Sequence, residues 1–201
     1  MSVRSRPARG FTLPEVLVST AILVLLAAMT VPSLVSYKNA KDARAVASTL
    51  TGISLSVNNV NRALGNLGFY QRVGVFPGHP SDLITPITTA KKNCAGTAYT
   101  TGNVSAWAAG APYSSSLLVP NSGIPTPLGW IRDTVYQSAT NDYVELRIDS
   151  VETGDARNID LAVDQFDDST LGVVRYEAEP AAPTVTSLHR VRYLISAPVG
   201  C

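Results

Sequence analysis

Charge and reactive side chains are scarce in this sequence of 201 residues. Charged residues make up 15% of it, below the roughly 25% of soluble domains, and the net charge is only +1. These values exclude a polybasic nucleic-acid binder and an acidic solvating tail. Two cysteines are too few for a disulfide scaffold or a four-ligand zinc site, and two distant histidines leave little material for histidine-based catalysis.

Sequence motifs of the common enzyme classes are also missing. The chain has no P-loop, no G-x-S-x-G, no G-x-G-x-x-G and no H-E-x-x-H. We therefore predict no catalytic or cofactor-binding residue and expect a structural protein rather than an enzyme.

The N-terminal region departs from this average composition. Residues 1–10 carry three arginines and no acid, and residues 11–37 contain Glu15 as their only charge. As a helix, the uncharged run 16–37 would span about 33 Å, enough for a hydrocarbon core of about 30 Å. The basic flank predicts a cytoplasmic N-terminus and an extracytoplasmic remainder, as in a single-pass inner-membrane protein. A cleaved secretory signal fits less well because its apolar region is only about 7–15 residues long.

Glu15 is unexpected in a membrane helix that serves only as an anchor, because a carboxylate at one end of a membrane span is unfavourable. Its presence suggests that this helix has a second role. The string GFTLPEVLVSTAIL at residues 10–23, behind a short basic leader, resembles the class III signal of type IV prepilins and type II secretion pseudopilins. The resemblance implies that a prepilin peptidase removes residues 1–10 by cutting between Gly10 and Phe11, and then methylates the new amine of Phe11. Pro14 is similar to minor pilins and pseudopilins at that position.

The same resemblance assigns two residues to filament assembly. Glu15 becomes the fifth residue of the mature chain and is expected to pair with the N-terminal ammonium of a neighbouring subunit in an apolar filament core, where an unpaired charge would be costly. Pro32 lies inside the apolar run and interrupts its hydrogen-bond ladder.

Our first interpretation of function is a minor-pilin-like structural subunit of a type IV pilus-type filament. A pseudopilin of a type II secretion system is the alternative, followed by a major pilin. A plain membrane-anchored binding protein, from a different class, would keep residues 1–10 and would not need Glu15. The implied partners are the prepilin peptidase, other pilin or pseudopilin subunits, and an inner-membrane assembly platform. The implied location is the inner membrane, followed by a pilus or periplasmic filament.

The expected fold is α+β and pilin-like, with a long N-terminal helix packed on a C-terminal antiparallel sheet. A helix over residues 12–64 is predicted, apolar all round in its half at 11–37 and amphipathic in its half at 38–64. The amphipathic stripe comprises Ala43, Val46, Ala47, Leu50, Ile53, Val57, Val60 and Leu64. A variable connecting region with one strand at 113–119 follows at 65–133, and the sheet and C-terminal tail occupy 134–201. Alternating hydrophobic residues predict strands at 143–149, 157–164, 170–179 and 185–196.

Two further features concern the part of the chain that follows the long helix, residues 65–201, which we call the head. The extracytoplasmic location predicts a disulfide between Cys94 and Cys201, and pilins commonly have a disulfide-bounded C-terminal region. Several pseudopilins bind calcium in a loop near the C-terminus, which makes Asp164, Asp167 and Asp168 candidate ligands and Asp160 the weakest member of the set. Because the spacing does not fit an EF-hand and acids are common in turns, a set of ordinary turn residues is the preferred interpretation.

Overall fold

The computed structural model describes residues 12–58, 67–114, 123–137, 143–178, 188–197 and 201. It divides into two compact units, Met1–Asn39 and Ala40–Cys201. Helix α1, Leu13–Asn58, begins in the first unit and ends in the second. The predicted helix is confirmed over this range, while residues 59–64, with Val60 and Leu64 of the predicted stripe, lie outside the described residues.

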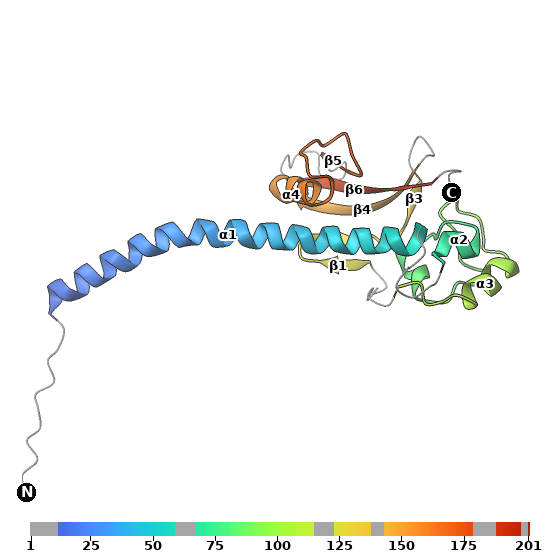
Figure 1. Ribbon diagram of the computed structural model, residues 1–201, viewed down its shortest axis with the longest axis horizontal. Coiled ribbons are helices and arrows are strands. Elements are labelled where there is room, and N and C mark those ends of the chain that lie inside the picture. Colours follow the sequence, from blue (N-terminus) through green and yellow to red (C-terminus); the bar gives the residue numbers. More distant parts are fainter. Residues whose placement is uncertain (1–11, 59–66, 115–122, 138–142, 179–187, 198–200) are drawn as a thin grey trace, which may run out of the picture. The chain divides into compact units, whose positions relative to one another are not determined.

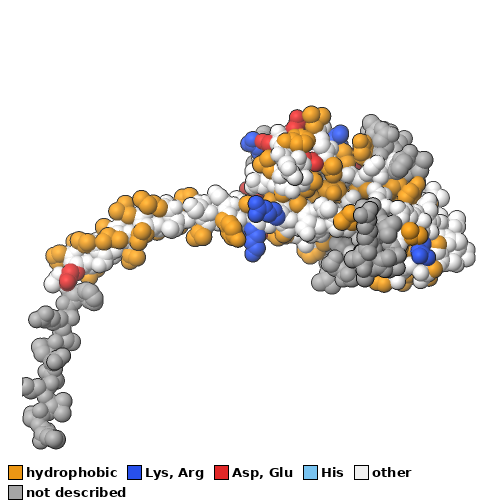
Figure 2. Space-filling view, in the orientation of Figure 1, with side chains coloured by type: hydrophobic (Ala, Val, Ile, Leu, Met, Phe, Trp, Pro, Cys, Tyr) orange, Lys and Arg blue, Asp and Glu red, His pale blue; other side chains and the backbone are white. Residues whose placement is uncertain are grey.

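The first unit is the apolar part of α1. None of its apolar stretch is buried inside the protein, and the helix is long and apolar enough to cross a membrane. Hydrophobic side chains cover this part of the helix in Figure 2. Several of its hydroxyl groups bond to the helix backbone itself, as in the bonds from Thr20 Oγ1 to the Leu17 carbonyl (2.9 Å) and from Thr30 Oγ1 to the Leu26 carbonyl (3.0 Å). These hydroxyl groups therefore add little cost to placing the segment in an apolar medium.

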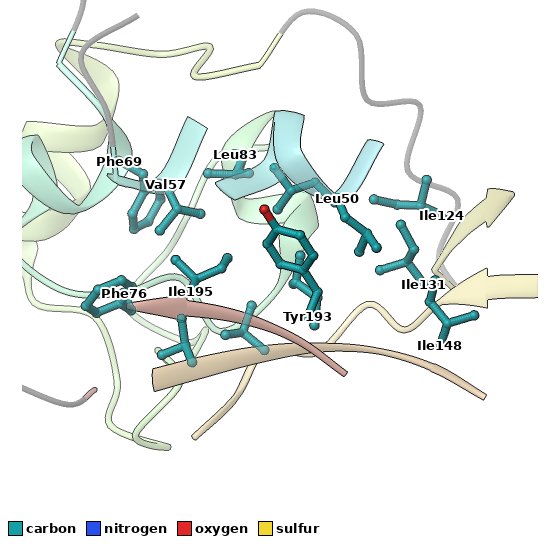
Figure 3. Packing of buried hydrophobic residues seen from close by; sticks show 14 of the residues in the cluster. Leu50, Val57, Phe69, Phe76, Leu83, Ile124, Ile131, Ile148, Tyr193 and Ile195 are labelled. Atoms are coloured by element: carbon teal, nitrogen blue, oxygen red, sulfur yellow. The ribbon is translucent and has the colours of Figure 1, made fainter. Parts of the chain in front are cut away.

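In the second unit, α1 buries a single stripe. The residues on it are Ala43, Val46, Ala47, Leu50, Ile53 and Val57. Their spacing of three and four residues places them on one side of the helix, as predicted. Figure 3 shows Leu50 and Val57 pointing toward Tyr193 and Ile195 of the sheet. The stripe and the inner face of the sheet form one core, and its burial stabilises both elements.

The sheet is antiparallel and follows the order β1-β2-β4-β6-β5 in the described residues, with β3 also paired to β4 (Figure 1). Its strands are β1 Ile124–Thr126, β2 Gly129–Ile131, β3 Tyr136–Gln137, β4 Tyr143–Glu152, β5 Val174–Ala178 and β6 Leu188–Ser196. These bounds confirm three of the four predicted strands, although residues 170–173 of the strand predicted at 170–179 are not in a strand, and residue 179 and residues 185–187 lie outside the described residues. The α+β layout expected from the sequence is therefore present.

The strand predicted at 157–164 is wrong, because these residues belong to helix α4, Thr153–Asp164. Ala156, Ile159 and Asp160 are buried, at the three- and four-residue spacing of one helix face, whereas Leu161 is 45% exposed. The alternation of Ile159, Leu161 and Val163 coexists with this helical period. The segment fits both the two-residue period of a strand and the three- and four-residue spacing of a helix. It forms a helix here because the helical arrangement is the one that buries its apolar residues against the core.

The region at 65–133 contains more structure than the predicted connecting region. It forms α2 Phe69–Val73, the 3₁₀ helix η1 Pro80–Leu83, α3 Thr101–Ala108, and strands β1 and β2. Of the strand predicted at 113–119, Tyr113 and Ser114 are described and are not in a strand; residues 115–119 lie outside the described part of the chain. Pairs of aromatic rings hold this region together, including Phe69 with Tyr113 at 5.4 Å between centroids.

Candidate functional site

Glu15 lies in the first turn of α1, where it closes the N-terminal cap of the helix. Its Oε2 accepts bonds from the Thr12 N–H and the Thr12 hydroxyl, both at 2.9 Å. The string T-L-P-E at 12–15 is the T-x-x-E signature of a capping box, a signal that our sequence reasoning missed. Both bonds from Thr12 reach Oε2, and within residues 12–58 no hydrogen bond reaches Oε1.

The other N-terminal residues of the predicted site are placed only in part. Gly10 and Phe11, the residues of the predicted cleavage site, lie outside the described residues. Pro14 falls in the first turn of α1, where its missing N–H costs no helical bond. Pro32 lies inside α1 and withholds one backbone donor from the ladder. The structure thus places Glu15 next to Thr12 at the start of the apolar helix, with Pro32 nearly five turns further along it.

The predicted disulfide between Cys94 and Cys201 is present. The Cα atoms are 5.6 Å apart, within the usual range of 4.4–6.8 Å, and the two cysteines are 107 positions apart in sequence. Both residues pack against the core cluster. The bridge therefore fastens Cys201 to the region before α3 and closes a loop that contains the sheet.

The candidate calcium ligands are already engaged by groups of the protein. Asp164 Oδ2 accepts the Val174 N–H at 2.8 Å, and Asp168 Oδ1 accepts the Thr170 N–H at 2.8 Å. Asp167 accepts hydrogen bonds from Arg157 and from the Tyr176 hydroxyl. Within the described residues, no group of three or more acidic, histidine or cysteine side chains is placed to hold a metal ion. Calcium binding stays a prediction from sequence.

Asp160, the weakest member of that set, has an unusual environment. It is fully buried on the inner side of α4, and its Oδ2 accepts the Asp168 N–H at 2.9 Å. Its Oδ1 has no hydrogen-bond partner in the described structure. Burial, together with the negative charges of Asp164 and Asp167, raises the pKa of Asp160 to about 6. This carboxyl is therefore poised to hold a proton under mildly acidic conditions.

A second buried carboxylate, Asp82, organises the region after α1. It accepts bonds from the Lys91 ammonium at 2.9 Å, from the Tyr99 hydroxyl at 3.0 Å and from the His79 N–H at 3.2 Å. Burial and the charge of Asp82 raise the pKa of Tyr99, which therefore remains a phenol and a donor. His79 caps η1 and contacts the Asp133 carbonyl, so its role in the structure is to shape the loop. Sequence reasoning missed this cluster because its members lie on separate turns of an aperiodic region.

Comparison with known proteins adds one finding. Residues 5–31 match the family model described as the prokaryotic N-terminal methylation motif. No curated protein matches the chain, and no solved structure matches it. The match includes Gly10, Phe11 and Glu15 and stops one residue before Pro32. The chain therefore carries the class III N-terminal methylation signal, as type IV pilins and pseudopilins do.

Proposed function

We propose that this protein is a minor-pilin-like structural subunit of a type IV pilus-type filament. In this proposal a prepilin peptidase cuts between Gly10 and Phe11 and methylates Phe11. Before assembly, the chain is anchored in the inner membrane by its N-terminal helix, and its head lies outside the cytoplasm. An assembly platform transfers it into a pilus or periplasmic filament beside other pilin subunits.

The observation that carries the proposal is the apolar half of α1 with Glu15 at its start. The methylation motif covers residues 5–31. Large side chains of the apolar half are exposed, among them Leu17, Val24 and Leu34 at 61%, 67% and 65%. Such a surface requires lipid or other helices around it. A bundle of the same helices satisfies that need after the subunit leaves the membrane.

Glu15 supplies the register of that bundle. Its Oε2 bonds to Thr12, and Oε1 remains for the methylated ammonium of Phe11 on the next subunit. At an effective dielectric constant of about 20, such a pair at 4 Å gains about 4 kcal/mol before desolvation. The main effect of the pair is therefore to fix the axial offset between neighbouring helices, and its net contribution to stability is smaller. Pro14, the fourth residue after the cut, favours a minor subunit over a major one.

A test of this proposal compares Glu15→Val with the wild type in cells that assemble the filament. We expect equal amounts of both proteins in the membrane, because removing a carboxylate from a membrane span does not oppose insertion. Sheared filaments should contain much less of the variant, since the neighbouring ammonium loses its partner, at a cost of about 3–5 kcal/mol.

Glu152→Val is the matched control, because it removes an exposed carboxylate from the end of β4 and leaves α1 intact. It should enter filaments as the wild type does. Equal recovery of Glu15→Val and wild type in sheared filaments would overturn the assigned role of Glu15. Retention of residues 1–10 on the mature protein would instead support a plain membrane-anchored binding protein.

A further inference from the structure

A row of arginines crosses the face of the sheet that is turned away from α1. Arg147 on β4 pairs in register with Arg192 on β6, which pairs with Arg175 on β5. On the other side of β4, the Arg132 N–H donates to the Arg147 carbonyl at 2.9 Å. The core residues Ile148, Val191 and Val174 alternate with these arginines, so the arginine side chains share the opposite face. We call these four residues the arginine row.

The arginine row is only partly neutralised. Like charges directly opposite one another on a sheet are destabilising, so the row needs carboxylates beside it. Glu145 bonds to Arg147 at 3.1 Å and lies 3.8 Å from Arg192, and Glu177 lies 3.6 Å from Arg192. Asp149 pairs with Arg132 and with one further arginine, Arg190. Among the described residues of this face, five arginines against these three carboxylates leave two positive charges in excess.

Two guanidinium groups in the row have unused donors. Arg192 Nε is buried and out of reach of a ligand, but the side chain is 29% exposed, and its Nη1 and Nη2 lie 3.8 Å from Glu145 and 3.6 Å from Glu177, too far for hydrogen bonds. Arg175 reaches only the Gly172 carbonyl, at 3.4 Å, and forms no ion pair with a described carboxylate. Arg175 and Arg192 are neighbours across the β5–β6 pair, so their free N–H groups lie on one patch of the sheet. A planar oxyanion is the group that guanidinium forks bind best.

An exposed aromatic ring lies on the same face. Trp130 is two residues before Arg132, so its side chain shares the face of the arginine row, and it is 52% exposed. Indole rings offer a flat apolar surface together with one N–H donor. The face thus combines guanidinium groups that can donate to an oxyanion, the flat apolar surface of an indole ring, and carboxylate acceptors at Asp149 and Glu177.

We propose that this face binds an acidic polysaccharide, through carboxylates carried on sugar rings. The sugar carboxylate accepts from Arg175 and Arg192, the hydroxyls donate to Asp149 and Glu177, and one ring lies on Trp130.

The interleaved acids favour this ligand over a nucleic acid. Duplex DNA carries one charge per about 1.7 Å of helix axis, which would press phosphates against Asp149 and Glu177. A polymer with one charge per sugar avoids that repulsion and uses both acids as acceptors. The net charge of the chain, +1, also gives no general attraction for a dense polyanion. Binding by this face does not depend on filament assembly, so either proposal can fail without the other.

The test is a titration of the full chain, in detergent micelles, with polygalacturonate. Calorimetry should show binding that weakens with salt, and fully methyl-esterified polygalacturonate should not bind. Arg175→Gln should weaken the affinity at least about tenfold, because it removes the least engaged guanidinium. Arg175→Lys should recover only part of the loss, because it restores the charge without the fork. Trp130→Ala should also weaken binding, and unchanged thermal midpoints will confirm that the variants fold.

Arg157→Gln is the matched control, since it removes the same charge from α4, where Arg157 pairs with Asp167. It should bind polygalacturonate as the wild type does. The proposal is overturned if polygalacturonate does not bind, or if Arg157→Gln weakens binding as much as Arg175→Gln. It is also overturned if single-stranded DNA or polyglutamate binds as tightly as polygalacturonate, because the face would then be a general polyanion patch.

Discussion

The pKa values of Asp160 and Asp149 are shifted in opposite directions, although both are aspartates of the same head. Burial would raise the pKa of Asp149, but the hydrogen bonds and charges of Arg190 and Arg132 outweigh it and hold that pKa below the usual range. Asp160 has no cation beside it in the described structure, so burial dominates and its pKa rises to about 6. The two carboxyls therefore couple folding to pH with opposite signs.

Asp160→Asn should stabilise the protein at pH 8 and have little effect at pH 4. In the folded wild type the raised pKa keeps Asp160 protonated up to about pH 6, whereas the unfolded chain loses that proton near 3.8. The contribution of Asp160 to the free energy of unfolding is therefore fully present below pH 4, and it is lost as the pH rises through 6. Asparagine is neutral throughout, so the thermal midpoint of the variant should exceed that of the wild type by a few degrees at pH 8.

Thermal unfolding at pH 4, 6 and 8 measures this difference directly. Asp168→Asn provides a contrast, because hydrogen bonds from the Thr170 and Leu171 backbone hold the pKa of Asp168 below its usual value. That variant should destabilise at pH 8. A midpoint difference for Asp160→Asn that does not change with pH would contradict the assigned environment.

Reduction of the Cys94–Cys201 bridge should lower the thermal midpoint by several degrees. In the chain-entropy model, a closed loop of about 100 residues stabilises the folded state by roughly 4–5 kcal/mol. Thermal unfolding with and without a thiol reductant measures the effect. The double variant Cys94→Ser/Cys201→Ser should start at the lower midpoint and not respond to the reductant. A wild type that also does not respond would show that the bridge contributes nothing to stability.

At the scale of elements, α1 carries two surfaces with different requirements. Ile53 is fully buried against the sheet, and Leu55, two residues further on, is 50% exposed. Ile53→Ala should therefore reduce the free energy of unfolding by about 2–5 kcal/mol, through lost burial and the cavity left behind. Leu55→Ala should change it by no more than about 0.5 kcal/mol. Chemical denaturation of both variants checks the pair, and equal losses would mean that the stripe is assigned to the wrong side.

The sequence predicted elements well wherever a single periodicity was present. Val144, Leu146 and Ile148 alternate with charged residues and predicted β4, and the spacing from Ala43 to Val57 predicted the buried side of α1. α4 was missed because Ile159, Leu161 and Val163 also fit a strand. Only the tertiary core, which buries Ala156 and Ile159 together, decides between the two periods.

The candidate sites divide in the same way. Gly10, Phe11 and Glu15 follow from a contiguous motif, and the disulfide follows from two cysteines and a compartment. The Asp82 cluster and the arginine row do not, because each depends on which distant segments become neighbours. Arg147, Arg192 and Arg175 meet only through the order β4-β6-β5, which places the last strand between two earlier ones.

At the scale of the whole molecule, the two units should behave differently in water. A fragment that begins at Asp42 keeps the buried stripe of α1 and the sheet and loses the exposed apolar half, so it should be a soluble monomer. The full chain should need detergent because its apolar half is exposed. Size-exclusion chromatography in plain buffer compares the two. A monodisperse full chain without detergent would contradict the assignment of a membrane anchor.

The central claim, that this chain is processed and assembled as a pilin, is tested most directly at its N-terminus. Mass spectrometry of protein taken from membranes of cells with an active prepilin peptidase should find Phe11 as the first residue, with one methyl group on its amine. Gly10→Val should leave residues 1–10 attached, because a side chain at Gly10 obstructs the peptidase. A wild-type N-terminus at Ser2, or anywhere within residues 30–40, would contradict the account.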